Sequence, residues 1–223
     1  MVVRETVCWI DRFDRSQVFT TTAGAGGWAI ADTSSSGTPT YTTIDGGGAK
    51  LTCVSTSEAE ILTLYQKDVL PFPLLNIQRM SFLAKVAGID NVTTLTMGLG
   101  SARNDTDDSV TTNAWFRMEG SASLTLVVVE TDDNTTDNND VATTKTLAST
   151  WKKFVIDFTN GIADVRFFID GERVASGTTF SMSAATSTTY VQPIFQIQKA
   201  SGTGVPSVTI RDIEIEYTTA LGA

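Results

Sequence analysis

WKKFVIDFTNGIADVRFFIDGERV (residues 151–174) is the stretch that decides the fold. Its first half places Phe154 and Ile156 at alternate positions, and its second half repeats the same apolar alternation. Side chains of a strand point alternately to its two faces, so this pattern predicts two strands that each have one packed face. The dipeptides at 160–161 (NG) and 170–171 (DG) predict tight turns, because Asn, Asp and Gly tolerate the positive φ that hairpins need.

The same alternation recurs at short intervals along the chain, while helical periodicity is almost absent. Many short strands at this spacing predict an all-β protein, an antiparallel β-sandwich or a barrel. No break in composition divides the sequence, so we expect one domain over residues 1–223, with an irregular Thr/Ser/Gly-rich segment at 16–48 that contains short strands. Further strands are expected at 49–54, 60–66, 79–86, 94–100, 114–119, 123–130, 191–199 and 207–217.

The apolar residues of the last expected strand change phase part-way along it. A β-bulge near residues 211–212 would return all of them to the core face. They are Val208, Ile210, Ile213, Ile215 and Tyr217.

Three parts of the chain resemble concanavalin A-like (laminin G-like) jelly-roll domains. In the hairpin, a Trp opens one strand and aromatic-Ile-Asp-Gly-Glu closes the other, as in the late hairpin of that family. WIDRFDRS (9–16), followed by a lone Trp, resembles the opening strand of jelly-roll lectins and glucanases. SVTIRDIEIEY (207–217) resembles their last strand, which pairs near the first. The resemblance implies a concanavalin A-like jelly-roll sandwich, and it specifies no chemistry.

Charge and composition exclude several classes of function. The net charge is −9, which repels nucleic acid phosphates, so we expect no nucleic acid partner. The chain has no histidine, and therefore lacks the usual general base, the usual zinc ligand and the base of a Ser-His-Asp triad. Cys8 and Cys53 could form one bridge or remain two buried thiols. No apolar run reaches the length of a membrane span, and the first residues lack the pattern of a signal peptide, so we expect cytoplasmic synthesis and no membrane partner.

One candidate catalytic group lies in the last expected strand. Asp212, Glu214 and Glu216 occupy alternate positions and so share one strand face. Paired carboxylates are what glycoside hydrolysis requires, and the set is superficially similar to the catalytic strand of family 16 glucanases. The order of Asp and Glu differs, however, and the strand lies at the end of the chain. The alternative, which we favour, is that these acids form a solvated strand face.

A second candidate is a calcium site in the acidic stretch 130–140. Carboxylate and amide oxygens at close spacing suit Ca²⁺, although the EF-hand pattern is not met. The smaller cluster at 104–108 is of the same kind. The alternative is a long solvated hairpin tip, because Asn, Asp and Thr are common in exposed turns. The candidate calcium ligands are Asp132, Asp133, Asp137 and Asp140; no other cofactor is expected.

Aromatic side chains provide a third candidate, a surface on which sugars stack. The alternative for each is a place in the core, since aromatics are the main packing material of a sandwich. Trp151 is expected in the core beside the hairpin. The candidate stacking residues are Trp28, Tyr41, Trp115 and Tyr190.

Taken together, these features favour a non-catalytic structural protein. A jelly roll without histidine or export signal, rich in Thr and acidic, is similar in character to bacteriophage capsid decoration (cement) proteins. We therefore expect a virion surface protein, made in the host cytoplasm, that binds the major capsid protein and copies of itself. The apolar, proline-containing segment LPFPLLNIQ (70–78) is the expected interface. Its candidate residues are Leu70, Pro71, Phe72, Pro73, Leu74, Leu75 and Ile77.

Two other functions stay open. The first is a carbohydrate-binding, lectin-like module for attachment to a host, which would use loops at the rim of the sandwich. The second is a glycan hydrolase that would use the three acids of the last strand.

Overall fold

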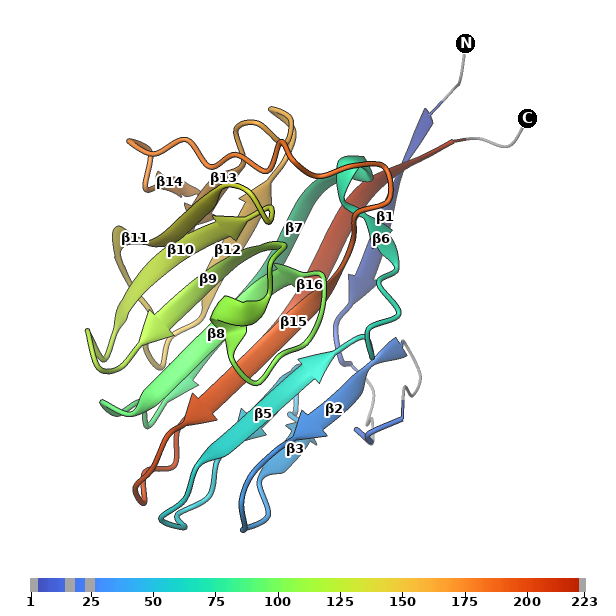
Figure 1. The fold of residues 1–223 in the computed structure, drawn as a ribbon. Helices are drawn as coiled ribbons and strands as arrows, with labels where there is room; N and C mark the ends of the chain where they lie inside the picture. The colour runs from blue at the N-terminus through green and yellow to red at the C-terminus, as the bar shows by residue number, and fades with distance from the viewer. Residues whose placement is uncertain (1–3, 15–18, 23–26, 221–223) are drawn as a thin grey trace.

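The computed structural model describes residues 4–14, 19–22 and 27–220. They form two eight-stranded antiparallel sheets stacked face to face (Figure 1). The expected all-β sandwich is therefore confirmed. Among these residues, no helix is long and apolar enough to cross a membrane.

The sheet that contains the ends of the chain is called sheet A here. Its strands run in the order β14-β13-β12-β7-β16-β4-β3, and β1 pairs with the second half of β16. This pairing confirms the expected contact between the first and last strands. The bounds are β1 (Arg4–Asp11), β3 (Thr40–Thr43), β4 (Ala49–Thr52), β7 (Ile77–Ala87), β12 (Lys152–Asp157), β13 (Arg166–Ile169), β14 (Glu172–Val174) and β16 (Ser207–Ala220).

The opposite sheet, sheet B, has the order β11-β10-β9-β8-β15-β5-β2, and β6 extends the pairing along β15. Two single-turn 3₁₀ helices, η2 (Leu74–Asn76) and η3 (Asp107–Ser109), lie in its connections. The strand bounds are β2 (Ala29–Asp32), β5 (Glu60–Tyr65), β6 (Phe72–Pro73), β8 (Thr93–Gly100), β9 (Asn113–Glu119), β10 (Leu126–Asp132), β11 (Asp137–Thr146) and β15 (Tyr190–Lys199).

The decisive hairpin forms, with one difference from the prediction. The turn at Asp170 and Gly171 is tight, with φ values of 50° and 82°. The connection from β12 to β13 is longer than a hairpin turn, because residues 158–165 make two successive turns before β13 begins.

The predicted bulge in the last strand is present. The register of β16 against β7 shifts between Arg211 and Glu214, and Asp212 has a φ of 50°. The bulge restores the alternation, so Ile213 and Ile215 are as fully buried as Ile210. It also marks the point along β16 where pairing passes from β4 to β1.

Interlocking phenylalanines from both sheets fill the centre of the sandwich. Phe82 and Phe154 of sheet A stack at 5.3 Å, and Phe116 of sheet B meets Phe154 edge-on at 4.8 Å. Phe195 meets Phe82 edge-on at 5.2 Å. Aromatic contacts of this kind contribute roughly 0.5–1.5 kcal/mol each beyond the burial of their area.

The two cysteines are separate thiols. Cys53 is buried in the core and Cys8 is exposed on β1. Burial raises the pKa of Cys53 to about 12, and the nearby Glu60 adds to the shift. Of the two alternatives left by the sequence, the structure thus has free thiols, and only one of them is buried.

Candidate functional site around Arg117

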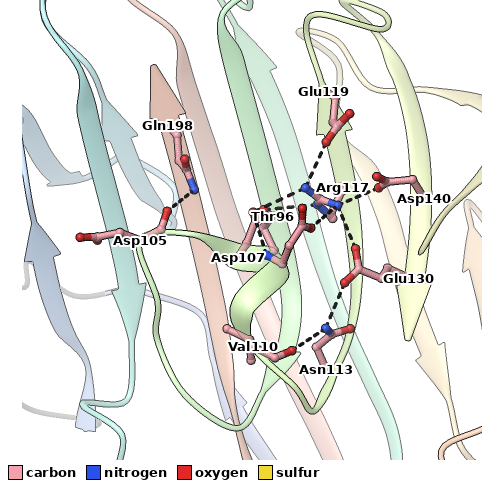
Figure 2. A network of polar contacts seen from close by, with 11 residues as sticks. Thr96, Asp105, Asp107, Val110, Asn113, Arg117, Glu119, Glu130, Asp140 and Gln198 are labelled. Atoms are coloured by element: carbon pink, nitrogen blue, oxygen red, sulfur yellow. Dashed lines mark hydrogen bonds and ion pairs between the residues drawn. The ribbon is translucent and has the colours of Figure 1, made fainter. Parts of the chain in front are cut away.

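A loop covers the outer face of sheet B, the face turned away from the core. Residues 101–112 connect β8 to β9 and fold back over the sheet, with η3 lying against it (Figures 1 and 2). The main-chain carbonyl of Asp105 accepts a hydrogen bond from Gln198 of β15 at 3.0 Å. Asp107 accepts one from the hydroxyl of Thr96 on β8. The loop therefore buries a sheet face that would otherwise be open to solvent.

Arg117 is the centre of the polar network under this loop (Figure 2). It lies on β9, and the strand alternation points it outward because Phe116 and Met118 face the core. Its side chain is only 2% exposed, and five carboxylates lie within ion-pair distance. These are Asp107 (3.3 Å), Asp108 (2.9 Å), Glu119 (3.1 Å), Glu130 (2.9 Å) and Asp140 (2.9 Å).

Glu130 is the innermost of the five acids, with a side chain 3% exposed. One of its oxygens accepts a hydrogen bond from Arg117 and the other accepts one from the amide of Asn113, at 3.0 Å. Burial nevertheless raises the pKa of Glu130 to about 7, against the opposing effect of Arg117. Burial would lower the pKa of Arg117, but the acids around it, Asp107 foremost, raise it well above the usual value.

Three of the acids form a rim that reaches solvent. The side chains of Asp108, Glu119 and Asp140 are 55%, 35% and 34% exposed. Burial raises the pKa of Glu119, and the charge of Asp140 adds to it. Burial likewise raises the pKa of Asp140, partly offset by Arg117. The site therefore presents closely spaced carboxylates that are held in place by one buried cation.

The sequence did not single out this cluster. The available signal was Arg117 and Glu119, two charged residues at alternate positions of an otherwise apolar strand. The sequence predicts the small acidic cluster at 104–108 only as a calcium candidate. The structure brings its members Asp107 and Asp108 to Arg117 instead.

The four candidate calcium ligands do not converge. Asp140 binds Arg117, while Asp133 accepts hydrogen bonds from the main-chain amides of Thr136 and Ala184. Asp132 and Asp137 are opposite each other at the ends of β10 and β11. Among the residues described, no three Asp, Glu, His or Cys side chains are placed to hold a metal ion. The stretch 130–140 does form a hairpin, but its tip is short: 130–132 belong to β10, 137–140 belong to β11, and only 133–136 form the turn.

Of the four candidate stacking aromatics, only Tyr190 is exposed. Trp28 and Trp115 are buried, so neither is available as a platform. Tyr41 is half-buried and its hydroxyl donates to the carbonyl of Ala31 at 2.7 Å. Trp151, expected in the core, instead lies half-buried on the outer face of sheet A, where the cations of Lys85 and Arg211 contact its ring.

The expected interface segment is divided between core and surface. Phe72, Leu74 and Ile77 are buried in the core, which corrects their assignment to an interface. Leu70 and Pro73 are half-buried. Pro71 and Leu75 are exposed, together with the preceding Val69. The apolar character of the segment therefore serves packing at least as much as any contact with a partner.

The three acids of β16 are only partly gathered. Asp212 and Glu214 line one shallow hollow of about 350 Å³, together with Arg12 and Lys153. Glu216 lies beyond it and forms an ion pair with Arg79 at 2.6 Å. All three are partly exposed on the outer face of sheet A, as expected for a solvated strand face.

Comparison with known proteins identifies solved structures of similar fold. No family model matches the chain, and no curated protein matches its sequence. Solved structures do match. The carbohydrate recognition domain of Emp47p has a TM-score of 0.61 at 8% identity, covering 93% of this chain and 94% of that one. A structure from work on endo-acting O-glycanases of the human gut microbiota has a TM-score of 0.60 at 11% identity, covering 96% and 99%. The apo Crh5 transglycosylase has a TM-score of 0.52 at 14% identity, covering 94% and 84%.

The chain has a concanavalin A-like jelly-roll fold. This confirms the fold that the resemblance implied. Sequence identities this low support a shared fold only, so a function has to be inferred from the residues of this chain.

Proposed function

We propose that this protein is a non-catalytic carbohydrate-binding domain, and that its binding surface is the carboxylate rim around Arg117. One observation carries the proposal: five carboxylates share a single buried guanidinium. A guanidinium has five N–H donors, whereas five carboxylates have ten oxygens. Acceptor oxygens on Asp108, Glu119 and Asp140 are therefore left over, fixed in position and open to solvent.

Sugar hydroxyls are the natural donors for such a surface. Charge-assisted hydrogen bonds to carboxylates are stronger than those between neutral groups. Because Arg117 and the loop hold the acids in place, little side-chain freedom would be lost on binding. The five acids outweigh the one cation, so the site favours neutral or amino sugars over sugars that carry acidic groups.

The geometry of Glu130 supports binding without catalysis. Glycoside hydrolysis needs one protonated and one ionised carboxyl group on either side of the scissile bond. Glu130 has the raised pKa of a general acid, but both of its oxygens are occupied and its side chain is almost completely buried. A sugar at the rim would meet Glu119 and Asp140 rather than Glu130.

Glycan-array screening followed by isothermal titration calorimetry tests this proposal. Glu119→Gln and Asp140→Asn should each weaken binding by about tenfold, since each removes a charged acceptor. Glu172→Gln, which changes an exposed acid of sheet A, is the matched control and should bind like wild type. Binding should survive EDTA. Absence of any glycan ligand, or cleavage of a bound glycan into products, would contradict the proposal.

A second candidate, capsid decoration, is favoured by an exposed apolar corner. Val69, Pro71 and Leu75 are exposed on one segment, and the exposed Tyr190 pairs with the adjoining Pro73. Such a corner would gain from being covered by the major capsid protein or by a second copy of this chain. Co-sedimentation with assembled phage capsids, lost in Val69→Ser/Leu75→Ser and kept in Glu119→Gln, would support this role. Equal sedimentation with and without capsids would contradict it.

A further inference from the structure

Several lysine and arginine side chains on the outer face of sheet A form no ion pair within the described part of the chain. Acidic residues outnumber Lys and Arg by 25 to 16 in this chain. Even so, six cations in the described ranges form no ion pair: Arg4, Arg12, Lys50, Lys67, Lys85 and Lys153. Four of these six line two neighbouring hollows on this face.

One of the hollows has no acidic residue in its lining. It has a volume of about 270 Å³ and is lined by Ile44, Lys50, Lys85, Val86, Ala87, Ser149, Ser207 and Thr209. The other hollow also contains Asp212 and Glu214, which offset its cations. The first hollow is therefore the better site for an anion.

Strand register aligns the charged groups of this hollow. Thr209 on β16 is directly opposite Lys50 on β4 and directly opposite Lys85 on β7. Residues paired in this way point to the same face, so the two lysines flank one threonine hydroxyl. Ser207 is two residues before Thr209 on the same face. Lys85 is held over the ring of Trp151, with its ammonium 4.8 Å from the ring centre.

Two hydroxyls are available to a ligand in this hollow. Ser207 and Thr209 are only 4% and 5% exposed, and both line the hollow. Within the described part of the protein neither hydroxyl has a hydrogen-bond partner, and neither oxygen is closed off from solvent. Both hydroxyls are therefore free to donate to an acceptor bound in this cationic hollow.

We propose that Lys50, Lys85, Ser207 and Thr209 bind a tetrahedral oxyanion, a sulfate or phosphate group carried on a saccharide; the choice of a saccharide as carrier rests on the proposed carbohydrate-binding function. Two ammonium groups would neutralise the oxyanion, and the two hydroxyls would donate to its oxygens. The hollow is large enough to admit the charged group with part of the sugar that carries it. This site lies on the opposite sheet from the Arg117 rim and is independent of it.

Titration calorimetry at low salt tests the site with matched probes: N-acetylglucosamine 6-sulfate, N-acetylglucosamine 6-phosphate, the unmodified sugar and sodium sulfate. The charged sugars should bind, inorganic sulfate should compete with them, and the unmodified sugar should not bind at this site. Lys50→Gln/Lys85→Gln should weaken binding by at least about tenfold. Thr209→Val, which keeps the shape of the side chain, should weaken it by about threefold to tenfold.

The control is Arg4→Gln/Lys67→Gln, which removes two unpaired cations elsewhere and changes the net charge equally. It should bind the charged sugars and inorganic sulfate like wild type. Equal losses in the two double variants would overturn the proposal, because the effect would then be one of general charge. Inorganic sulfate that binds as tightly as the sulfated sugar would overturn the saccharide as carrier. Tighter binding of poly-glutamate would point to an acidic protein instead and would also overturn it.

Discussion

Lys199 and Glu60 form an ion pair that is closed to solvent at the end of the sandwich. Nζ of Lys199 lies 2.9 Å from Oε1 of Glu60, and both side chains are 0% exposed. The same ammonium donates to the carbonyl oxygens of Val54 and Thr56, at 2.5 and 2.9 Å. The second oxygen of Glu60 accepts from the main-chain amide of Val54. The pair therefore joins β15, β5 and the loop between β4 and β5.

Removing one partner of this pair should be costly. Lys199→Met leaves Glu60 as a buried, uncompensated charge, and we expect a loss of about 3–5 kcal/mol in the free energy of unfolding. Lys152→Met breaks the partly exposed pair with Asp170 and should cost at most about 1 kcal/mol. Urea denaturation of both variants measures the difference. A loss for Lys199→Met as small as that for Lys152→Met would show that the buried pair does not stabilise this end of the sandwich.

The raised pKa of Glu130 predicts how stability depends on pH. In the folded protein the pKa is about 7, against 4.5 for an ordinary Glu. The folded state thus holds a proton that the unfolded state releases, so the contribution of Glu130 is complete below pH 4.5 and is lost as the pH rises toward 7. The free energy of unfolding of wild type, measured relative to Glu130→Gln, should fall across this window by up to about 1.4 kcal/mol per pH unit.

Asp170→Asn is the control of opposite sign. Burial raises the pKa of Asp170, but Lys152, the main-chain amide of Lys153 and the charge of Lys145 together lower it by more, so Asp170 stabilises the folded protein when it is ionised. A difference between wild type and Glu130→Gln that is constant from pH 4.5 to 7 would contradict the assignment.

The sequence predicted those elements whose apolar residues alternate. The bulge in β16 is an example, because only an extra residue there lets Ile210 and Ile213 share the core face. β11 is not predicted, because its residues lack such an apolar alternation. It is a polar edge strand whose pairing with β10 rests on backbone hydrogen bonds, so its side chains carry almost no apolar signal.

The Arg117 cluster could not be predicted from local pattern. Its burial depends on a loop that folds back over sheet B and on Asp140, 23 residues further along the chain. Charged residues on a strand ordinarily indicate a solvated face, and the sequence contains no sign that the loop 101–112 covers this one. The division of the segment 70–78 between core and surface could not be predicted from local pattern either. Leu74 is buried and Leu75 is exposed only because η2 points their side chains in different directions.

Gly98 should tolerate no side chain, because it lies in the middle of β8 where another strand approaches closely. A Cβ at this position would overlap the carbonyl oxygen of Ala114 and lie 2.7 Å from the Cα of Trp115. Both obstacles are backbone atoms of β9, so the sheet would have to separate locally. We expect Gly98→Ala to lower the free energy of unfolding by at least about 2 kcal/mol. Gly177→Ala, where a Cβ meets nothing within 4 Å, is the control and should stay within about 0.5 kcal/mol of wild type. Equal stability of the two variants would contradict the close approach of β8 and β9.

The two thiols should differ sharply in reactivity. At pH 7.5, DTNB should label Cys8 in the folded protein and reach Cys53 only after unfolding, because Cys53 is buried and has a pKa of about 12. Labelling of Cys8 should be slower than that of a free cysteine, since burial, Glu214 and Glu216 all raise its pKa and so reduce its thiolate fraction. Glu216→Gln should accelerate labelling, both by removing one negative charge and by releasing Arg79, whose charge lowers the pKa of Cys8. Glu172→Gln, at the far edge of sheet A, should leave the rate unchanged. If Glu216→Gln labels no faster than this control, Cys8 does not sense the acids of β16.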